Sequence, residues 1–278
     1  MRGRPGRRQR HYRAPDMRFA ILSDVHANLE ALSATLQRIS REAVDRIVCL
    51  GDIVGYNANP SECPALLRDA GALCVAGNHE RAVTGQLPPI AIPRAVARSA
   101  QWTRRQLDSE MLNFLARLPS ELHVPPSLVA VHGALHAPQQ RETLYLDSEE
   151  RRRLSFEALA IHASGARFCA FGHTHVLGIF ARDGREFAYE GDEIVLQADT
   201  FYLFNPGSVD QPRTAERRAT FMVLDTARHT VAVRRVDYDA EAAFAKTRRA
   251  GLLPSSATGF GSIRAILRGV RCAGIHWR

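Results

Sequence analysis

The sequence predicts a layered α/β fold, and two observations point to it. Five short apolar runs of strand length, rich in Val, Ile, Leu, Phe and Cys, occur in the first two-thirds of the 278 residues. Between them lie stretches with apolar residues at three- and four-residue spacing, the period of an amphipathic helix. Alternation of strands and helices along a chain is typical of α/β proteins.

The elements of this first part follow from those two patterns. We expect strands over residues 18–23, 46–50, 72–76, 127–131 and 167–171. The apolar spacing predicts helices over residues 29–39, 64–70, 95–107 and 154–161.

The pattern changes after Gly178 to short alternating segments with turn signals such as Asp183-Gly184. Segments 194–197, 200–204, 220–224 and 231–236 predict hairpins that form or extend a second sheet. Two helices, 240–249 and 262–270, are expected after them. Because no linker divides the chain, we predict one domain over residues 17–254, followed by a basic and partly helical tail at 255–278.

Most of the positive charge lies in the first 16 residues. The formal net charge is +8, and residues 1–16 contain six arginines and one aspartate, a net +5 that leaves +3 for the remainder. This arm has Gly and Pro among its arginines and no periodicity, so we expect it to be disordered. Met17 stands directly before the first strand, and we expect the arm to be dispensable or a product of start-site choice.

The composition favours neither a membrane or secreted protein nor one built on cysteine pairs. No window approaches the roughly 18 consecutive apolar residues of a membrane span, and no charged start precedes an apolar signal segment. The five cysteines are odd in number and show no C-x-x-C spacing, which predicts neither disulfides nor a cysteine-based zinc site. We therefore expect a cytoplasmic protein with no membrane partner.

Each of the five expected strands ends in a possible metal ligand. In open α/β sheets the loops after the strands converge, so ligands bind there. Any one of these residues has an ordinary alternative: Asp52 could be a helix N-cap, and Asn78 could be a turn residue. Together they predict one site, made of Asp24, His26, Asp52, Asn78, His79, His132, His173 and His175.

The spacing of two pairs supports this interpretation. Residues i and i+2 of an extended chain point to the same side. The pair Asp24 and His26 and the pair His173 and His175 are therefore each expected to face a common point.

The ligand types indicate the kind of metal. Imidazole nitrogens with carboxylate and amide oxygens, and no thiolate, suit Mn, Fe, Zn or Co better than Ca or Mg. Two carboxylates, four histidines and one Asn are too many for one ion, whereas a carboxylate can bridge two ions about 3.5–4 Å apart. Two divalent ions with two aspartates keep a net charge of about +2, or +1 with a hydroxide, which attracts phosphate.

At this point the sequence resembles the calcineurin-like metallophosphoesterases. The D-x-H of Asp24 and His26, "GDIVGY" at 51–56, "GNHE" at 77–80, "VHG" at 131–133 and "GHTH" at 172–175 match that family's five motifs in order. "NPGSVDQPR" at 205–213 and "RRVDYDAEAAFA" at 234–245 extend the likeness toward the bacterial phosphodiesterase-like branch.

The resemblance implies a fold, a ligand assignment and a reaction. The fold would be a four-layer α/β/β/α sandwich of two mixed sheets flanked by helices. Asp24, His26 and His175 would hold one metal, Asn78, His132 and His173 the other, and Asp52 would bridge both. A metal-bridging hydroxide would attack phosphorus. His79 would face the substrate and stabilise or protonate the leaving oxygen.

Two departures from the family pattern bear on the substrate. Ser/Thr protein phosphatases of the superfamily continue "GD" into V-D-R-G, whose Arg grips phosphate. Here Asp52 is followed by Ile-Val-Gly-Tyr, which makes protein phosphatase activity less favoured. Asp210 stands where Gly is common, and we expect it to face solvent. Arg213 is either a phosphate contact or a surface residue.

The expected activity is dimetal hydrolysis of a phosphate ester, most simply as a phosphodiesterase on a small or nucleotide-like substrate, with manganese, iron or zinc. A non-catalytic scaffold of the same fold is one alternative, although scaffolds usually lack ligands that are all present here. A nuclease acting on DNA or RNA ends is the other, which the near-neutral body does not favour. The sequence predicts no oligomeric state.

Overall fold

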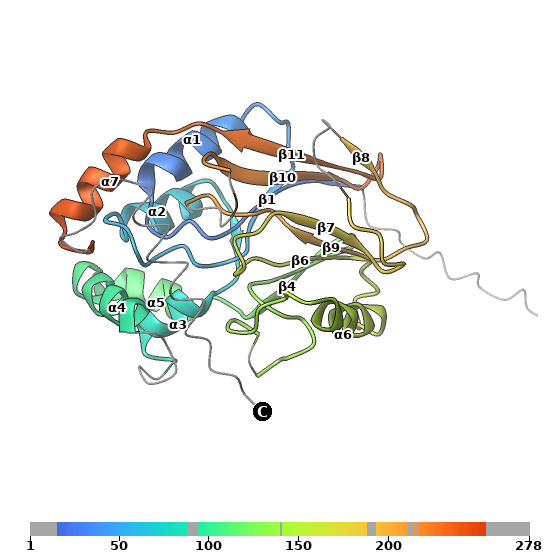
Figure 1. The fold of residues 1–278 in the computed structure, drawn as a ribbon, viewed down its shortest axis with the longest axis horizontal. Coiled ribbons are helices and arrows are strands. Elements are labelled where there is room, and N and C mark those ends of the chain that lie inside the picture. Colours follow the sequence, from blue (N-terminus) through green and yellow to red (C-terminus); the bar gives the residue numbers. More distant parts are fainter. Residues whose placement is uncertain are drawn as a thin grey trace, which may run out of the picture.

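The computed structural model describes residues 16–87, 94–139, 141–187, 193–210, 214 and 216–253. Two β-sheets lie face to face, with helices over their outer faces (Figure 1). Helices α1 and α2 cover the first sheet, α7 lies beside α1, and α6 covers the second sheet. The predicted four-layer α/β/β/α fold is confirmed.

The first sheet has six strands in the order β3-β2-β1-β10-β11-β8. β1, β2 and β3 are parallel because α1 and α2 connect them, so their carboxyl ends share one edge. β10 pairs antiparallel with both β1 and β11. The bounds are β1 Arg18–Leu22, β2 Arg46–Cys49, β3 Leu73–Cys74, β8 Ile194–Val195, β10 Ala219–Asp225 and β11 Thr230–Val236.

The second sheet has five strands in the order β4-β5-β6-β9-β7. Its three central strands β5, β6 and β9 are parallel, and the edge strands β4 and β7 are antiparallel to their neighbours. The bounds are β4 Glu121–Val124, β5 Leu128–Val131, β6 Phe168–Ala170, β7 Gly178–Ala181 and β9 Tyr202–Asn205.

Four of the seven helices in the described ranges begin at a side chain that accepts a backbone N–H of the first turn, which satisfies a donor that would otherwise lack a partner. These caps are Asn28, Asp108, Ser148 and Asp239. The helices are α1 Leu29–Ile39, α2 Glu62–Asp69, α3 Asn78–Thr84, α4 Arg94–Gln106, α5 Ser109–Ala116, α6 Glu149–Ala160 and α7 Ala240–Arg249.

The core is divided by the sheets, as strand β1 illustrates. Successive side chains of a strand point to opposite faces. Ala20 and Leu22 pack toward the helices on the outer face. Phe19 and Ile21 pack between the sheets, against residues such as Phe204 of the second sheet. Burial on both faces fixes the position of β1, and thereby of the loop that follows it.

Most predicted elements are present, with differences at their ends. The expected strand at 72–76 is reduced to the two residues of β3, and α6 begins at Glu149 because Ser148 caps it there. The sequence patterns missed α3, α5, β4 and β7. The prediction that the late hairpins build a second sheet is wrong for β8, β10 and β11. These strands extend the first sheet, because β10 pairs with β1, β11 with β10, and β8 with β11.

Several expectations lie outside the described residues, namely the arm up to residue 15, the helix at 262–270, the tail and Arg213. Within the described ranges, no helix is both long enough and apolar enough to cross a membrane.

The core assignment predicts different effects of one substitution at two isoleucines. Ile21 is fully buried between the sheets, whereas Ile161 after α6 is 86% exposed. We expect Ile21→Ala to lower the free energy of unfolding by about 2–5 kcal/mol. Ile161→Ala should change it by less than about 0.5 kcal/mol. Urea unfolding measures both, and equal losses would contradict the assignment.

Candidate metal centre

The residues predicted from the strand ends lie together in the structure. Asp24 and His26 follow β1, Asp52 follows β2, and Asn78 follows β3 of the first sheet. His132 follows β5 and His173 and His175 follow β6 of the second sheet. All are buried. The site therefore lies where the carboxyl ends of strands from both sheets meet.

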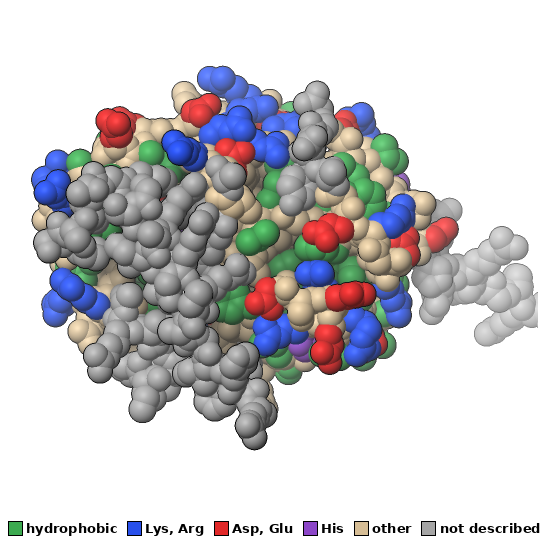
Figure 2. Space-filling view, in the orientation of Figure 1, with side chains coloured by type: hydrophobic (Ala, Val, Ile, Leu, Met, Phe, Trp, Pro, Cys, Tyr) green, Lys and Arg blue, Asp and Glu red, His purple; other side chains and the backbone are tan. Residues whose placement is uncertain are grey.

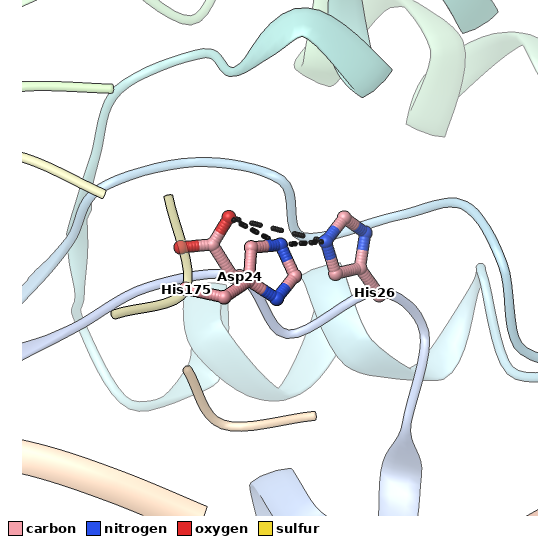
Figure 3. Close-up of side chains that lie close together, drawn as sticks. All are labelled: Asp24, His26 and His175. Atoms are coloured by element: carbon pink, nitrogen blue, oxygen red, sulfur yellow. Dashed lines mark hydrogen bonds and ion pairs between the residues drawn. The ribbon is translucent and has the colours of Figure 1, made fainter. Parts of the chain in front are cut away.

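A first cluster contains Asp24, His26 and His175 (Figure 3). His175 Nε2 lies 3.2 Å from Asp24 Oδ1 and 3.1 Å from His26 Nε2. Neighbouring ligand atoms that share one ion at 2.0–2.2 Å are themselves about 2.8–3.6 Å apart in octahedral or tetrahedral geometry. These two separations match that spacing, although His26 Nε2 is 3.9 Å from Asp24 Oδ1.

A second cluster contains Asn78, His132 and His173. His132 Nε2 lies 3.2 Å from Asn78 Oδ1 and 3.2 Å from His173 Nδ1. The three atoms thus have the spacing of ligands around one ion.

Asp52 joins the two clusters. Its Oδ2 atom lies 3.3 Å from His132 Nε2 and 3.8 Å from His26 Nε2. The other oxygen, Oδ1, accepts a hydrogen bond of 2.9 Å from the backbone N–H of His79. One carboxylate oxygen therefore faces both clusters while the second fixes its orientation.

Two histidines of the second cluster have a defined tautomer. His132 Nδ1 is 2.7 Å from the Leu50 carbonyl, and His173 Nε2 is 3.2 Å from the Thr143 carbonyl. Because a carbonyl only accepts, each of these nitrogens donates its proton. In the neutral rings the opposite nitrogens, His132 Nε2 and His173 Nδ1, then present lone pairs to the cluster, as metal ligands do.

The prediction that His173 and His175 face one point as an extended pair is wrong. The backbone is left-handed at both residues, with φ of 62° and 55°, so the period-two argument does not apply. His173 joins the second cluster and His175 the first, which is the division that the family resemblance implies. Left-handed φ also occurs at Asp24, His26 and Asp52. Such strained non-glycine backbone is concentrated at functional sites.

The charge states of several groups suit a cation. Burial raises the pKa of the Asp24 carboxyl, but His175 and His132 together lower it below its ordinary value. Burial acts in the same way on Asp52, whose pKa is lowered by His132 with smaller effects of His79 and His26. Burial lowers the pKa of His26, which is therefore neutral near pH 7. Burial lowers the pKa of His132 as well, but Asp52 raises it to about 10, so metal binding would displace a proton.

The residues present fit divalent ions. Asp24 Oδ1 is fully buried, and no donor among the described residues hydrogen-bonds to it. A buried carboxylate oxygen without a hydrogen bond is unfavourable, and a cation at the first cluster would stabilise it. Imidazole, carboxylate and amide ligands without thiolate suit Mn, Fe or Zn.

Glu80, whose role the sequence left undecided, supports the loops of the site. It is fully buried, and its carboxylate accepts backbone N–H groups from Gly77, Asp52, Ile53 and Val54 at 2.7–3.0 Å. Burial raises its pKa to about 7. Glu80 thereby ties the loop that carries Asp52 to the start of α3, which carries Asn78 and His79.

Two glycines permit close contacts at the site. A Cβ atom at Gly77 would lie 2.1 Å from Asp52 Oδ1, and one at Gly172 would lie 1.9 Å from Ser23 Oγ. Either side chain would displace a neighbour of the site. Gly172 is thus required by contact with the loop after β1.

Aromatic rings that no sequence pattern predicted border both clusters. Tyr145 stacks on His173 with ring centroids 3.9 Å apart. Tyr56 contacts both His26 and His79, with centroids 4.6 Å and 4.5 Å apart. The His79 side chain is 1% exposed, and burial lowers its pKa, so it is neutral near pH 7.

The prediction that Asp210 faces solvent is wrong. Asp210 is fully buried, and its Oδ1 accepts a 2.7 Å hydrogen bond from Asn28 Nδ2. Its backbone N–H donates to the Asp24 carbonyl. Burial raises its pKa to about 8, so the carboxyl is largely protonated at neutral pH and adds little charge behind Asp24.

Comparison with known proteins places this geometry in a family. The family model of the calcineurin-like phosphoesterase superfamily domain matches residues 17–229. An uncharacterized protein of Methanocaldococcus jannaschii is 34% identical over 231 residues, which are 82% of this chain and 90% of that protein.

Solved structures agree with the family match. A metallophosphoesterase from Sphaerobacter thermophilus is similar with a TM-score of 0.73 and 35% identity, over 87% of this chain and 96% of that one. A hypothetical protein from Pyrococcus horikoshii has a TM-score of 0.69 at 18% identity, over 86% and 94% of the two chains, and shares the fold. The chain therefore belongs to the calcineurin-like phosphoesterase superfamily and is a phosphoric ester hydrolase.

Proposed function

We propose that this phosphoesterase is a phosphodiesterase that uses two divalent ions to hydrolyse a small or nucleotide-like substrate. The observation that carries the proposal is the position of Asp52 Oδ2, which faces His26 of one cluster and His132 of the other. A single oxygen between two three-residue clusters is the arrangement expected of a bridging ligand.

In this proposal the seven ligands divide between two ions. Asp24, His26 and His175 hold the first ion, and Asn78, His132 and His173 hold the second. Asp52 contributes to both. When bound, the ions supply a water of lowered pKa as the nucleophile and neutralise charge on the phosphate oxygens. Manganese, iron and zinc all suit these ligands.

His79 is the residue we assign to the leaving group. Its backbone N–H holds Asp52, while its ring extends from the start of α3 beside the first cluster. Because its pKa is lowered, the neutral ring donates a hydrogen bond from N–H to the leaving oxygen rather than acting as a permanent cation.

Preference for a diester is supported by residue 56. Protein phosphatases of the superfamily have a phosphate-gripping arginine in this part of the chain, where the present chain has neutral Tyr56. A diester phosphate has one negative charge and a monoester has up to two, so the diester needs less positive charge around it.

The four cysteines within the described ranges are buried and unpaired, which supports action in the cytoplasm.

Nucleic acid is the less favoured substrate. Many surface arginines pair with acidic side chains, among them Arg68 with Glu110, Arg151 with Asp147 and Arg185 with Asp183. Figure 2 shows acidic side chains among the basic ones on the described part of one face. Paired arginines contribute less to phosphate binding than a continuous basic surface does.

The bridging role of Asp52 is tested by Asp52→Asn. The amide keeps the size of the side chain but removes the charge that two ions share. We expect bound metal to fall below two ions per chain and kcat to fall by at least about 100-fold. Elemental analysis after dialysis and hydrolysis of bis(4-nitrophenyl) phosphate measure these effects. Exposed Asp183→Asn is the control, and full metal occupancy in Asp52→Asn would exclude bridging.

The role of Glu80 is tested by Glu80→Gln. The amide replaces one acceptor oxygen with a donor that opposes the backbone N–H groups around it. We expect metal affinity to fall about 10–100-fold, as is usual when a residue supporting a ligand is altered. Calorimetric titration with Mn²⁺ measures the change. Glu110→Gln, on the surface, should bind as the parent protein does, and equal affinities in all three proteins would exclude the role.

The substrate class is tested with the protein reconstituted in turn with Mn²⁺, Zn²⁺ and Fe²⁺. We expect faster hydrolysis of small phosphodiesters than of phosphomonoesters or oligonucleotides. Activity on the small diester should change little between 50 mM and 200 mM salt, because few charges are involved. Oligonucleotide binding that falls by about 10³-fold or more over that range would instead favour the nuclease. If no substrate is hydrolysed with any of the three metals, the non-catalytic scaffold is favoured.

A further inference from the structure

We propose that Tyr56 is a positioning residue that fixes the His79 imidazole for its work on the leaving group. The effect of Tyr56 on catalysis rests on the proposed function, in which His79 acts on the leaving group. The orientation of the His79 ring by Tyr56 rests on the contacts around His79.

Three rings pack against one another beside the first cluster. Tyr56 lies edge-on to His79, with centroids 4.5 Å apart and planes at 64°. It also lies against His26 at 4.6 Å, and His26 meets His79 at 4.7 Å and 73°. Edge-to-face packing of rings is favourable and directional. Tyr56 therefore limits the rotation of the His79 ring from one side.

On another side the His79 ring lies against glycine backbone. A Cβ atom at Gly55 would lie 2.1 Å from His79 Nδ1 and within 3.0 Å of Cε1 and Cγ. Nε2 is therefore on the part of the ring that points away from Gly55. Only a residue without a side chain at position 55 leaves room for the ring between Tyr56 and the backbone.

His79 differs from His132 and His173 in what orients it. Those two rings each donate to a backbone carbonyl. His79 Nδ1 is fully buried and has no hydrogen-bond partner among the described residues. Because no hydrogen bond within the described ranges fixes Nδ1, the orientation of the ring depends on packing, and Tyr56 is the aromatic side chain with the shortest centroid distance to it.

Tyr56 is itself held in an unfavourable conformation. Its φ of 61° is left-handed, which is rare for a bulky side chain. Its backbone N–H donates to Ser99 Oγ of α4 at 2.6 Å, and this bond holds the strained residue in place. Strain of this kind persists where the surroundings impose it and is common at functional sites. Here it directs the tyrosine ring toward His79.

The kinetic test compares two leaving groups. His79 matters most when the leaving oxygen is a poor leaving group, because such an oxygen needs a proton or hydrogen bond. We expect Tyr56→Ala to lower kcat about 10–100-fold on an alkyl phosphodiester and less than about 3-fold on bis(4-nitrophenyl) phosphate. Tyr56→Phe keeps the ring and should retain the parent rates. In a His79→Ala background, Tyr56→Ala should add no further loss.

Two kinetic results would overturn the positioning role of Tyr56. One is an equal loss of kcat on both substrates, and the other is a loss in the double variant that equals the product of the two single losses. Metal content is measured in parallel, and a fall in Tyr56→Ala would assign the effect to His26 instead.

A second measurement does not depend on activity. In the metal-free protein labelled with ¹³C-histidine, the ring signals of His79 are assigned by their absence in His79→Ala. We expect them to broaden or split in Tyr56→Ala and to stay single and sharp in Tyr56→Phe. Sharp single signals in both variants would overturn the proposal. If the parent protein hydrolyses no diester, the proposed function fails, and this spectrum still decides the role of Tyr56.

Discussion

The carboxylate of Asp52 is the group on which the rest of the site depends. One oxygen lies between the clusters, and the other holds the backbone N–H of His79. The backbone N–H of Asp52 donates a hydrogen bond to the Glu80 carboxylate, which also accepts one from the backbone N–H of Gly77. The loops after β2 and β3 are therefore joined by two carboxylates. Asp52, after β2, accepts a hydrogen bond from His79, and Glu80, after β3, accepts one from Asp52. Moving either loop would disturb both clusters together.

Burial is what makes these contacts strong. Two ionised aspartates and several imidazoles lie in a part of the protein with little exposure to water, where electrostatic interactions are less screened. The same burial makes an oxygen without a hydrogen bond, such as Asp24 Oδ1, unfavourable. The strands supply that environment, since β1 is covered by helices on one face and by the second sheet on the other.

The sequence was informative where local pattern and tertiary structure agree. Apolar runs predicted β1, β2, β5 and β6, and the rule that sites lie at the carboxyl ends of parallel strands brought Asp24 and His175 together although 151 positions separate them. Prediction from the sequence failed where contacts between distant parts of the chain determine the structure. No local signal shows that β10 pairs with β1, that Asp210 is buried beneath Asn28, or that the left-handed backbone of His173 and His175 sends their rings to different clusters.

Because the clusters draw residues from both sheets, they also connect the two halves of the fold. His132 of the second sheet lies beside Asn78 of the first, and His175 lies beside Asp24. An ion bound at either cluster would act as a clasp between the sheets, comparable to a crosslink between segments far apart in the chain. Such binding stabilises only the assembled molecule, so metal supply would set its resistance to unfolding and proteolysis as well as its chemistry.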